Sequence, residues 1–190
     1  MSTATLTQRI DISRRAVTFV REAGLIFCGS LLLAASARLW LPLGPVPVTA
    51  QTLAVLLLAG ALGGRRAAAA TLTYIAQGLA GMPVFAGGGA GPVHLLGPTG
   101  GYLVGFVAAG LVCGELLRRG WFARPAVRPA VMALGILVIY AFGALWLASF
   151  VGMRAALVSG VAPFVLPDAV KVMLAAILAP RAGRIVNRML

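Results

Sequence analysis

Acidic side chains, histidine and cysteine are scarce in this sequence: its 190 residues include four Asp and Glu, one His and two Cys. Apart from Asp168 the acids are Asp11, Glu22 and Glu115, which lie at or near the ends of apolar runs. General acid–base catalysis needs titratable groups held together in one site. His94 has no Cys, Asp or Glu near it in the sequence, which argues against a metal site. We therefore predict no catalytic residues, no bound metal and no cofactor.

The cysteines and the lysine exclude further kinds of site. Cys28 and Cys113 fall inside apolar runs, and two isolated cysteines form neither a disulfide framework nor a zinc site. Lys171 is the single lysine, and no G-x-x-x-x-G-K-[ST] motif occurs, so the chain does not bind ATP through a phosphate loop. The formal net charge of +12 comes from arginines clustered between apolar runs. That pattern indicates membrane orientation rather than nucleic-acid binding.

Apolar residues, at 61% of the chain, exceed the roughly half that is usual in soluble domains. This composition predicts an all-α integral membrane protein, because helices satisfy their own backbone groups in lipid. Glycine, proline and arginine clusters divide the apolar sequence into six expected spans. These are residues 23–41, 49–62, 67–79, 102–117, 131–152 and 162–178, the last of them closed by Pro180. Residues 1–20 form a predicted cytoplasmic tail or short interfacial helix, with disorder equally compatible, and residues 21–190 form the membrane domain.

The arginines test the number of spans, because cytoplasmic loops of membrane proteins are enriched in Lys and Arg. With a cytoplasmic amino terminus and six spans, thirteen arginines fall on the cytoplasmic side and two, Arg38 and Arg154, on the outer side. Removing one span would move later clusters to the wrong side. We therefore expect both termini in the cytoplasm. The proline-stiffened turn before Thr49 and a Gly/Pro-rich loop between the third and fourth spans, residues 81–101, are then outside.

The last span contains an opposite-charge pair, Asp168 and Lys171, at a spacing that places both on one helix face. Each charge near a bilayer centre costs about 2.5 to 3.5 kcal/mol, so such residues face protein or a cavity. One interpretation is an ion pair that only holds helices together. The other is a recognition site, in which Asp168 supplies acceptors and Lys171 supplies donors to a small polar ligand.

Further polar and aromatic residues are expected on the same outer half of the bundle. Some have structural alternatives: Tyr74 and Phe85 are more often core aromatics, and Gln51 could bond an unpaired carbonyl where the second span begins. Glycines at 87–89 and 97–101 would let backbone N–H groups approach a ligand. The candidate binding residues are Thr49, Gln51, Tyr74, Phe85, Gly87, Thr99, Gly100, Tyr102, Asp168 and Lys171.

Four motifs in this region carry a resemblance to a known family. They are PVPVTAQTL (45–53), GMPVFAGG (81–88), GPTGGY (97–102) and DAVK (168–171). With these motifs in order from about residue 23 to 179, the chain resembles the BioY family, the biotin-specific S components of energy-coupling factor (ECF) transporters. The resemblance implies a six-helix S-component bundle in the bacterial inner membrane. It also implies capture of external biotin, and transport driven by a transmembrane coupling protein with two ATPases that alone use ATP.

The resemblance also assigns roles to residues. The family's Asp-x-x-Lys corresponds to Asp168 and Lys171 as substrate contacts, although it leaves open which end of biotin Lys171 holds. S components carry a small-residue stripe on the first helix that docks the coupling protein, and here Ser30 and Ala34 correspond to it. Whether the chain can act alone, as a homo-oligomer, is left open by the sequence. Two alternatives also remain: an S component for another heterocyclic vitamin, and an intramembrane enzyme.

Overall fold

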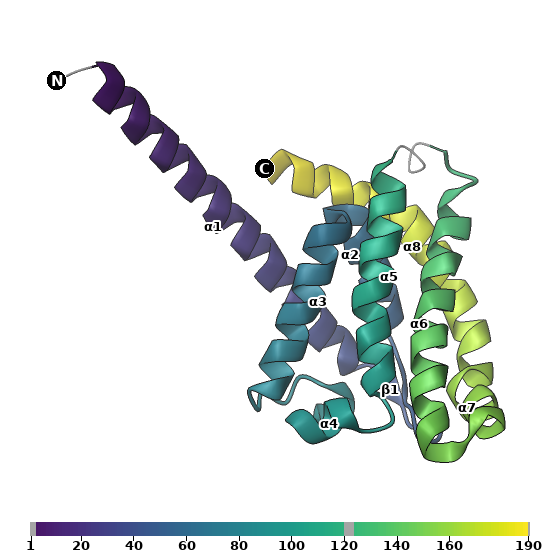
Figure 1. Ribbon diagram of the computed structural model, residues 1–190. Helices are drawn as coiled ribbons and strands as arrows, with labels where there is room; N and C mark the ends of the chain where they lie inside the picture. The colour runs from purple at the N-terminus through teal and green to yellow at the C-terminus, as the bar shows by residue number, and fades with distance from the viewer. Residues whose placement is uncertain (1–2, 120–123, 190) are drawn as a thin grey trace.

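The computed structural model describes residues 3–119 and 124–189 and is mainly helical (Figure 1). In this described part of the chain, six longer helices form the body, and three short helices and two short strands connect them. The longer helices are α1 (Thr3–Ala37), α2 (Gln51–Leu62), α3 (Gly64–Leu79), α5 (Gly100–Arg118), α6 (Arg128–Val151) and α8 (Ala162–Met189). The connecting elements are β1 (Trp40–Leu41), β2 (Val48–Thr49), η1 (Ala86–Gly88), α4 (Pro92–Leu96) and α7 (Met153–Gly160).

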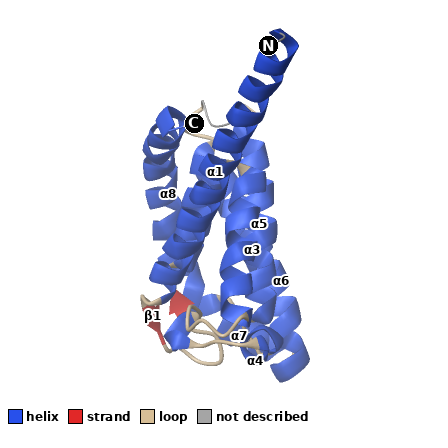
Figure 2. Ribbon diagram, turned by 90° about the vertical axis from the view of Figure 1, so that its left-hand side faces the viewer, coloured by secondary structure: helices blue, strands red, loops and turns tan. Residues whose placement is uncertain are grey.

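The longer helices run up and down, so both described ends of the chain lie at one end of the bundle. The strands, α4 and α7 lie at the opposite end, as Figures 1 and 2 both show. We call these the terminal end and the hairpin end. Helix α2 packs against α3, α5 and α8 and is buried over most of its length. An apolar helix of this kind belongs in the centre of a bundle.

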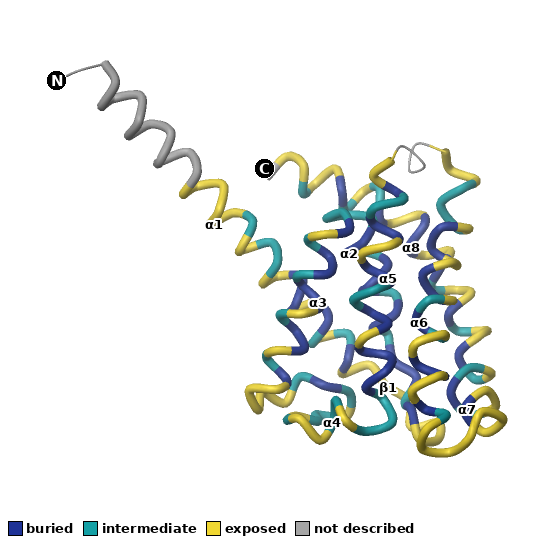
Figure 3. The backbone as a smooth tube through the Cα atoms, viewed as in Figure 1, coloured by how far each residue is buried: buried dark blue, intermediate teal, exposed yellow. Residues whose placement is uncertain are grey.

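Among the described residues, four helices are long and apolar enough to cross a membrane: residues 16–37 of α1, all of α5 and α6, and residues 162–188 of α8. Figure 3 colours many positions along these helices as exposed. The exposed residues include apolar ones such as Leu137 at 61% and Leu166 at 78% exposure. Such surfaces suit contact with lipid. The chain is therefore a multi-pass membrane protein. Helices α2 and α3 have 12 and 16 residues, shorter than the roughly 20 that span a bilayer unaided.

The chain between α1 and α2 differs from the expected extension of the first span to residue 41. Helix α1 ends at Ala37, and Trp40–Leu41 pairs antiparallel with Val48–Thr49. Gly44, with φ of 90°, lies between the two strands, where a left-handed backbone favours glycine. The strand pairing satisfies backbone groups that a helix ending inside the membrane would leave exposed. The first half of α1 covers most of the predicted tail, whose residues 1 and 2 lie outside the described residues.

The expected end of the last span at Pro180 is also wrong. Helix α8 continues through Pro180 to Met189 and contains Pro167 as well. Proline removes one helical hydrogen bond and bends a helix, and the last turns of α8 run at an angle to the rest (Figure 1). Interior prolines are tolerated in membrane helices where neighbouring groups satisfy the freed carbonyl. Proline here accompanies a bend rather than an end.

Candidate functional site

A cavity lies at the hairpin end of the bundle, between α2, α3, α5, α6 and α8. Its walls are mostly apolar, and the space that the centre of a water molecule can reach is about 40 Å³, room for a few waters at about 10–15 Å³ each. The β1–β2 hairpin and the segment between α3 and α5 cover it. The residues that line it are Val46, Pro47, Thr49, Gln51, Thr52, Tyr74, Ala86, His94, Thr99, Tyr102, Leu103, Phe106, Ile139, Tyr140, Phe164 and Asp168.

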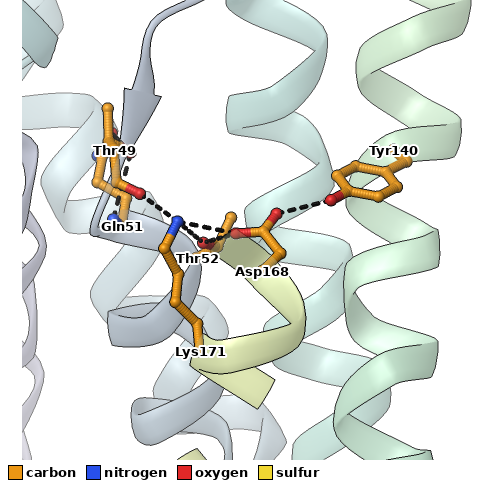
Figure 4. A network of polar contacts seen from close by, with 6 residues as sticks. All are labelled: Thr49, Gln51, Thr52, Tyr140, Asp168 and Lys171. Carbon is orange, nitrogen blue, oxygen red and sulfur yellow. Dashed lines mark hydrogen bonds and ion pairs between the residues drawn. The ribbon is translucent and has the colours of Figure 1, made fainter. Parts of the chain in front are cut away.

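Asp168 is the charged residue of the cavity wall and is 1% exposed. Its Oδ1 accepts hydrogen bonds from Thr52 Oγ1 at 2.8 Å and Lys171 Nζ at 2.8 Å, and its Oδ2 accepts one from Tyr140 Oη at 2.8 Å (Figure 4). A carboxylate can accept about four hydrogen bonds. These three contacts fix the carboxylate in place and leave one acceptor position for a further donor.

Lys171 lies behind this carboxylate and is not among the residues that line the cavity. Its Nζ donates to the Thr49 carbonyl at 2.6 Å, Thr52 Oγ1 at 3.1 Å and Asp168 Oδ1 at 2.8 Å (Figure 4). An ammonium has three donors, and all three are used. The Thr49 carbonyl is available because the chain passes there from β2 into α2. Lys171 therefore joins α8 to the start of α2.

A second polar group lies on the α2–α3 side of the cavity. Gln51 Nε2 donates to Tyr74 Oη at 2.8 Å, and Tyr74 Oη donates to the Val84 carbonyl at 3.3 Å. Thr49 Oγ1 donates to Gln51 Oε1 at 3.2 Å and accepts from the Gln51 backbone N–H. Thr49 thus links the two polar groups, through its side chain to Gln51 and through its carbonyl to Lys171.

Aromatic rings hold the cover against the bundle. Phe85 is fully buried and stacks on His94 with ring centroids 4.8 Å apart, and it meets Tyr74 edge-on at 5.6 Å. A side chain at Gly78 would collide with the Phe85 ring, so glycine lets the cover close onto α3. Burial lowers the pKa of His94 below the usual range of histidine, because a charged imidazolium is poorly solvated there. His94 therefore stacks as a neutral ring.

The opposite wall is built around Tyr102 of α5. Its hydroxyl donates to the Gly160 carbonyl at 2.7 Å, and its ring stacks near Phe164 with centroids 6.2 Å apart. A side chain at Gly143 would collide with this ring, so the glycine lets α6 lie directly against Tyr102. Tyr102 consequently presents its ring, rather than its hydroxyl, to the cavity.

The structure brings six of the ten candidate binding residues to the cavity wall. They are Thr49, Gln51, Tyr74, Thr99, Tyr102 and Asp168. The other four, Phe85, Gly87, Gly100 and Lys171, support that wall from outside. Gly87, with φ of 68°, lies against the Trp40 ring, and a side chain at Gly100 would collide with the Leu95 carbonyl. These glycines serve backbone geometry and close packing.

Sequence reasoning missed two residues that bind Asp168 directly, Thr52 and Tyr140. Thr52 directly follows the candidate residue Gln51 in the PVPVTAQTL motif. Its place in that motif is the signal that could have identified it. Tyr140 lies in an aliphatic helix 28 positions before Asp168, and only its polar hydroxyl in an apolar span marked it. His94 was considered solely as a metal ligand. Among the described residues, no three His, Cys, Asp or Glu side chains gather in a way that could hold a metal ion.

The two candidate docking residues lie on the inner side of α1. Ser30 is fully buried, accepts a hydrogen bond from Gln77 Nε2 at 3.1 Å and donates to the Phe27 carbonyl at 2.7 Å. Ala34 is partly buried. Ser30 thus contacts α3, which packs against α1. The exposed face of α1 is formed instead by residues such as Phe27, Leu31 and Leu32.

A bundle of membrane-length helices with a buried carboxylate beside an internal apolar cavity defines a class: multi-pass membrane proteins with a site for a small solute. The BioY family model matches residues 5–188, so the chain belongs to the BioY family. The resemblance noted in its four motifs is thereby confirmed. This is a family of transporters, and the chain is accordingly a transport protein rather than an enzyme.

Individual relatives cover most of the chain. It is 39% identical over 161 residues to a probable biotin transporter BioY of Pyrococcus horikoshii, covering 85% of this chain and 95% of that protein. It is 37% identical over 159 residues to the biotin transporter BioY of Thermotoga maritima, covering 81% and 90%. The fold is similar to the crystal structure of the S-component for biotin from an ECF-type ABC transporter. There the TM-score is 0.75 at 24% identity, with 86% of this chain and 91% of that chain covered.

Proposed function

We propose that this chain is a biotin-binding membrane subunit that mediates biotin uptake. The relatives named as biotin transporters support the ligand, since they match this chain over most of their length. The observation that carries the proposal is the Asp168 carboxylate, which is buried, charged and turned toward a cavity with one acceptor position open. Biotin's ureido ring has N–H groups that would complete that position with a charge-assisted hydrogen bond.

The rest of the cavity fits the rest of biotin. Tyr102, Phe106 and Phe164 provide apolar surface for the bicyclic ring and the valerate chain. Because the three donors of Lys171 are used by protein acceptors, we assign the biotin carboxylate to the cover instead. There the His94 ring and the glycine-rich backbone provide N–H groups, whereas the Thr99 hydroxyl already donates to the His94 carbonyl at 3.2 Å. Lys171 then acts by fixing Asp168 and the start of α2.

Ligand entry requires the cover to move. Room for a few water molecules is less than a biotin molecule occupies, and the hairpin together with residues 80–99 closes the cavity. Arg38, just after α1, donates a hydrogen bond to the Pro83 carbonyl in this cover. We propose that this contact breaks and re-forms as ligand enters, because it joins two segments that the helices themselves do not hold rigidly.

The proposed membrane arrangement has six spans, both termini in the cytoplasm and the hairpin end facing outside, in the bacterial inner membrane. Helices α2 and α3 would be held by their neighbours despite their length, as membrane-buried short helices are. Arginines at the helix ends support the orientation: Arg65, Arg118 and Arg128 lie at the terminal end, as the positive-inside rule requires for a cytoplasmic side.

Transport in this proposal uses a transmembrane coupling protein and two ATPases as partners. The similarity of fold to an S-component of an ECF-type transporter supports that assembly. The chain working alone, as a homo-oligomer, is the other arrangement under the same function. Recovery of the three partner subunits with the tagged chain from native membranes would distinguish these two arrangements.

The direct test identifies the ligand. The chain is purified from membranes of cells grown with biotin, and bound small molecules are released and analysed by mass spectrometry. We expect biotin in near-stoichiometric amount, displaced by added biotin and by no other vitamin tested. Recovery of a different heterocyclic vitamin would show that this vitamin, and not biotin, is the ligand. Chemical turnover of biotin or lipid without ATPase partners would instead support the enzyme alternative.

A further inference from the structure

The terminal end of the bundle contains a second, larger hollow that the biotin proposal does not use. It lies between the ends of α2, α5 and α8 and the starts of α3 and α6, and the space open to the centre of a water molecule is about 500 Å³. Four arginines line it, Arg66, Arg118, Arg128 and Arg184, and no acidic side chain does so among the described residues. We call this hollow the arginine crevice.

Its positive charge is only partly balanced. The neighbouring hollow on the α3 side adds Arg65, Glu22 and Glu115. Glu22 pairs with Arg66 at 2.6 Å and Glu115 pairs with Arg118 at 3.0 Å. Arg128 takes part in a further interaction of its own, and without it the two hollows hold four arginines against two glutamates among their described lining residues. This is an excess of two positive charges. A ligand for this region should therefore be an anion.

The starts of two helices add to this preference. Helices α3 and α6 begin at the crevice, and neither has a side-chain cap or an acidic residue in its first turn. Helix starts carry partial positive charge and free N–H groups that favour anions. Guanidinium groups bind phosphate oxygens in pairs. A phosphate ester matches this set of donors in charge and geometry.

An apolar groove adjoins the crevice and indicates the remainder of the ligand. Leu25 and Leu32 of α1, Leu57 of α2, and Leu178 and Ile185 of α8 line it. Ala61 and Leu62 line both the groove and the crevice, so the two are continuous around the end of α2. Arg181 lies at the groove as well. An acyl chain in the groove would place its head group among the arginines.

We propose that the crevice and groove bind one anionic phospholipid, with its phosphate in the crevice and an acyl chain between α1, α2 and α8. The crevice lies at the ends of membrane-length helices, where lipid head groups lie. Basic pockets between membrane helices are known to suit such head groups. Bound there, the lipid joins α1, α2 and α8 at the terminal end, and the protein is more stable with it than without it.

The test measures lipid binding to the delipidated full-length protein in neutral detergent, by native mass spectrometry and by thermal melting. Dioleoyl phosphatidylglycerol is compared with dioleoyl phosphatidylcholine, which has the same chains without net charge. Glycerophosphoglycerol supplies the same anionic head group without chains. We expect one phosphatidylglycerol per chain to bind preferentially and raise the melting temperature, with no competition from equal concentrations of glycerophosphoglycerol.

Variants locate the site. Arg118→Gln with Arg184→Gln should weaken phosphatidylglycerol binding about fivefold per arginine, from about 1 kcal/mol for each. Arg184 is exposed, so Arg184→Gln alone is a second variant that should fold and show a single such loss. Arg124→Gln removes the same charge from an exposed position at the same end, outside the crevice, and should leave binding unchanged.

Several results would overturn the proposal. Equal binding of phosphatidylglycerol and phosphatidylcholine would show that the head-group charge is not recognised. A loss of phosphatidylglycerol binding in Arg124→Gln equal to that in Arg184→Gln would show general attraction by basic residues instead of a site. Competition by glycerophosphoglycerol as strong as by the lipid would assign the crevice to soluble phosphate esters. Unchanged lipid binding in the crevice variants, with loss of protein partners from native membranes, would assign it to a protein contact.

Discussion

Lys171 Nζ lies 2.8 Å from Asp168 Oδ1, yet the carboxylate lines the cavity and the ammonium does not. The pair is therefore both a helix contact and part of a candidate site, the two interpretations that the sequence left open. Thr49 and Thr52 complete the contact from the α2 side. This division of roles, Asp168 toward the ligand and Lys171 toward the protein, leads to different expectations for the two residues.

Lys171→Met should mainly destabilise the fold. It leaves Asp168, which is 1% exposed, without its opposite charge, and breaking a buried pair costs about 3 kcal/mol or more. We expect a lower melting temperature in detergent and a smaller loss of biotin affinity than Asp168→Asn causes. The matched control is Arg119→Gln, whose pair with Glu115 is exposed and should change melting little. A larger affinity loss in Lys171→Met than in Asp168→Asn would assign the ammonium to the ligand.

Tyr140→Phe tests the hydroxyl that holds the second carboxylate oxygen. Phenylalanine keeps the ring but removes the 2.8 Å hydrogen bond to Asp168 Oδ2, so we expect biotin affinity to fall about tenfold, from about 1.5 kcal/mol. Tyr102→Phe is the control, because its hydroxyl binds the Gly160 carbonyl and not the carboxylate. Isothermal titration of both variants would show an effect confined to Tyr140; equal losses would contradict this role.

His94 should titrate below the ordinary range of histidine, because burial lowers its pKa. The displaced cover would bind the proton more readily than the closed one, so closure weakens as pH falls through the ordinary titration range. His94 is the single histidine of the chain, so NMR of the ring, with a histidine-free tag, measures it directly. Unfolding in strong detergent should restore the ordinary midpoint. A folded-state midpoint at or above that value would contradict burial of the ring.

The membrane orientation can be tested with a cysteine at each end of the bundle. Val93 is 83% exposed in the cover, and Arg124 is exposed at the terminal end. In a Cys28→Ala background, Val93→Cys should react with a membrane-impermeant maleimide in intact cells. Arg124→Cys should react only after permeabilisation. The reverse pattern would invert the proposed topology.

Ser30→Leu separates packing from docking on α1. Ser30 is fully buried against Gln77 of α3, so a larger side chain should destabilise the protein by about 1 to 3 kcal/mol. Leu31→Ser changes an exposed neighbour on α1 and should leave the melting temperature nearly unchanged. Normal melting of Ser30→Leu, with loss of the coupling protein, would restore the docking role expected from the sequence.

Much of this arrangement followed from the sequence because apolar runs, glycines and arginines mark helices and their ends locally. Five of the six expected runs correspond to helices that begin or end within a few residues of prediction. The last residues of the first run form β1 instead of helix. A run of apolar residues does not reveal this, because the strand forms by pairing with β2. Pro180 was misread because proline can bend a membrane helix as well as end one.

The site was predictable where chemistry was unusual and hidden where it depended on folding. Asp168 was conspicuous because a carboxylate in an apolar helix is costly. Tyr140 was missed because its contact with Asp168 exists only once α6 packs against α8. The roles of Lys171 and Phe85, behind the wall rather than in it, likewise depend on side-chain direction across several helices.

The most direct measurement is isothermal titration of biotin into purified wild-type and Asp168→Asn protein. The substitution keeps size and shape but removes the charge at the open acceptor position, and charge-assisted hydrogen bonds contribute about 1.5 to 3 kcal/mol. The account predicts at least about tenfold weaker binding by a variant that still inserts and purifies normally. Wild-type affinity in Asp168→Asn would remove the carboxylate from the site and contradict the proposed mode of biotin recognition.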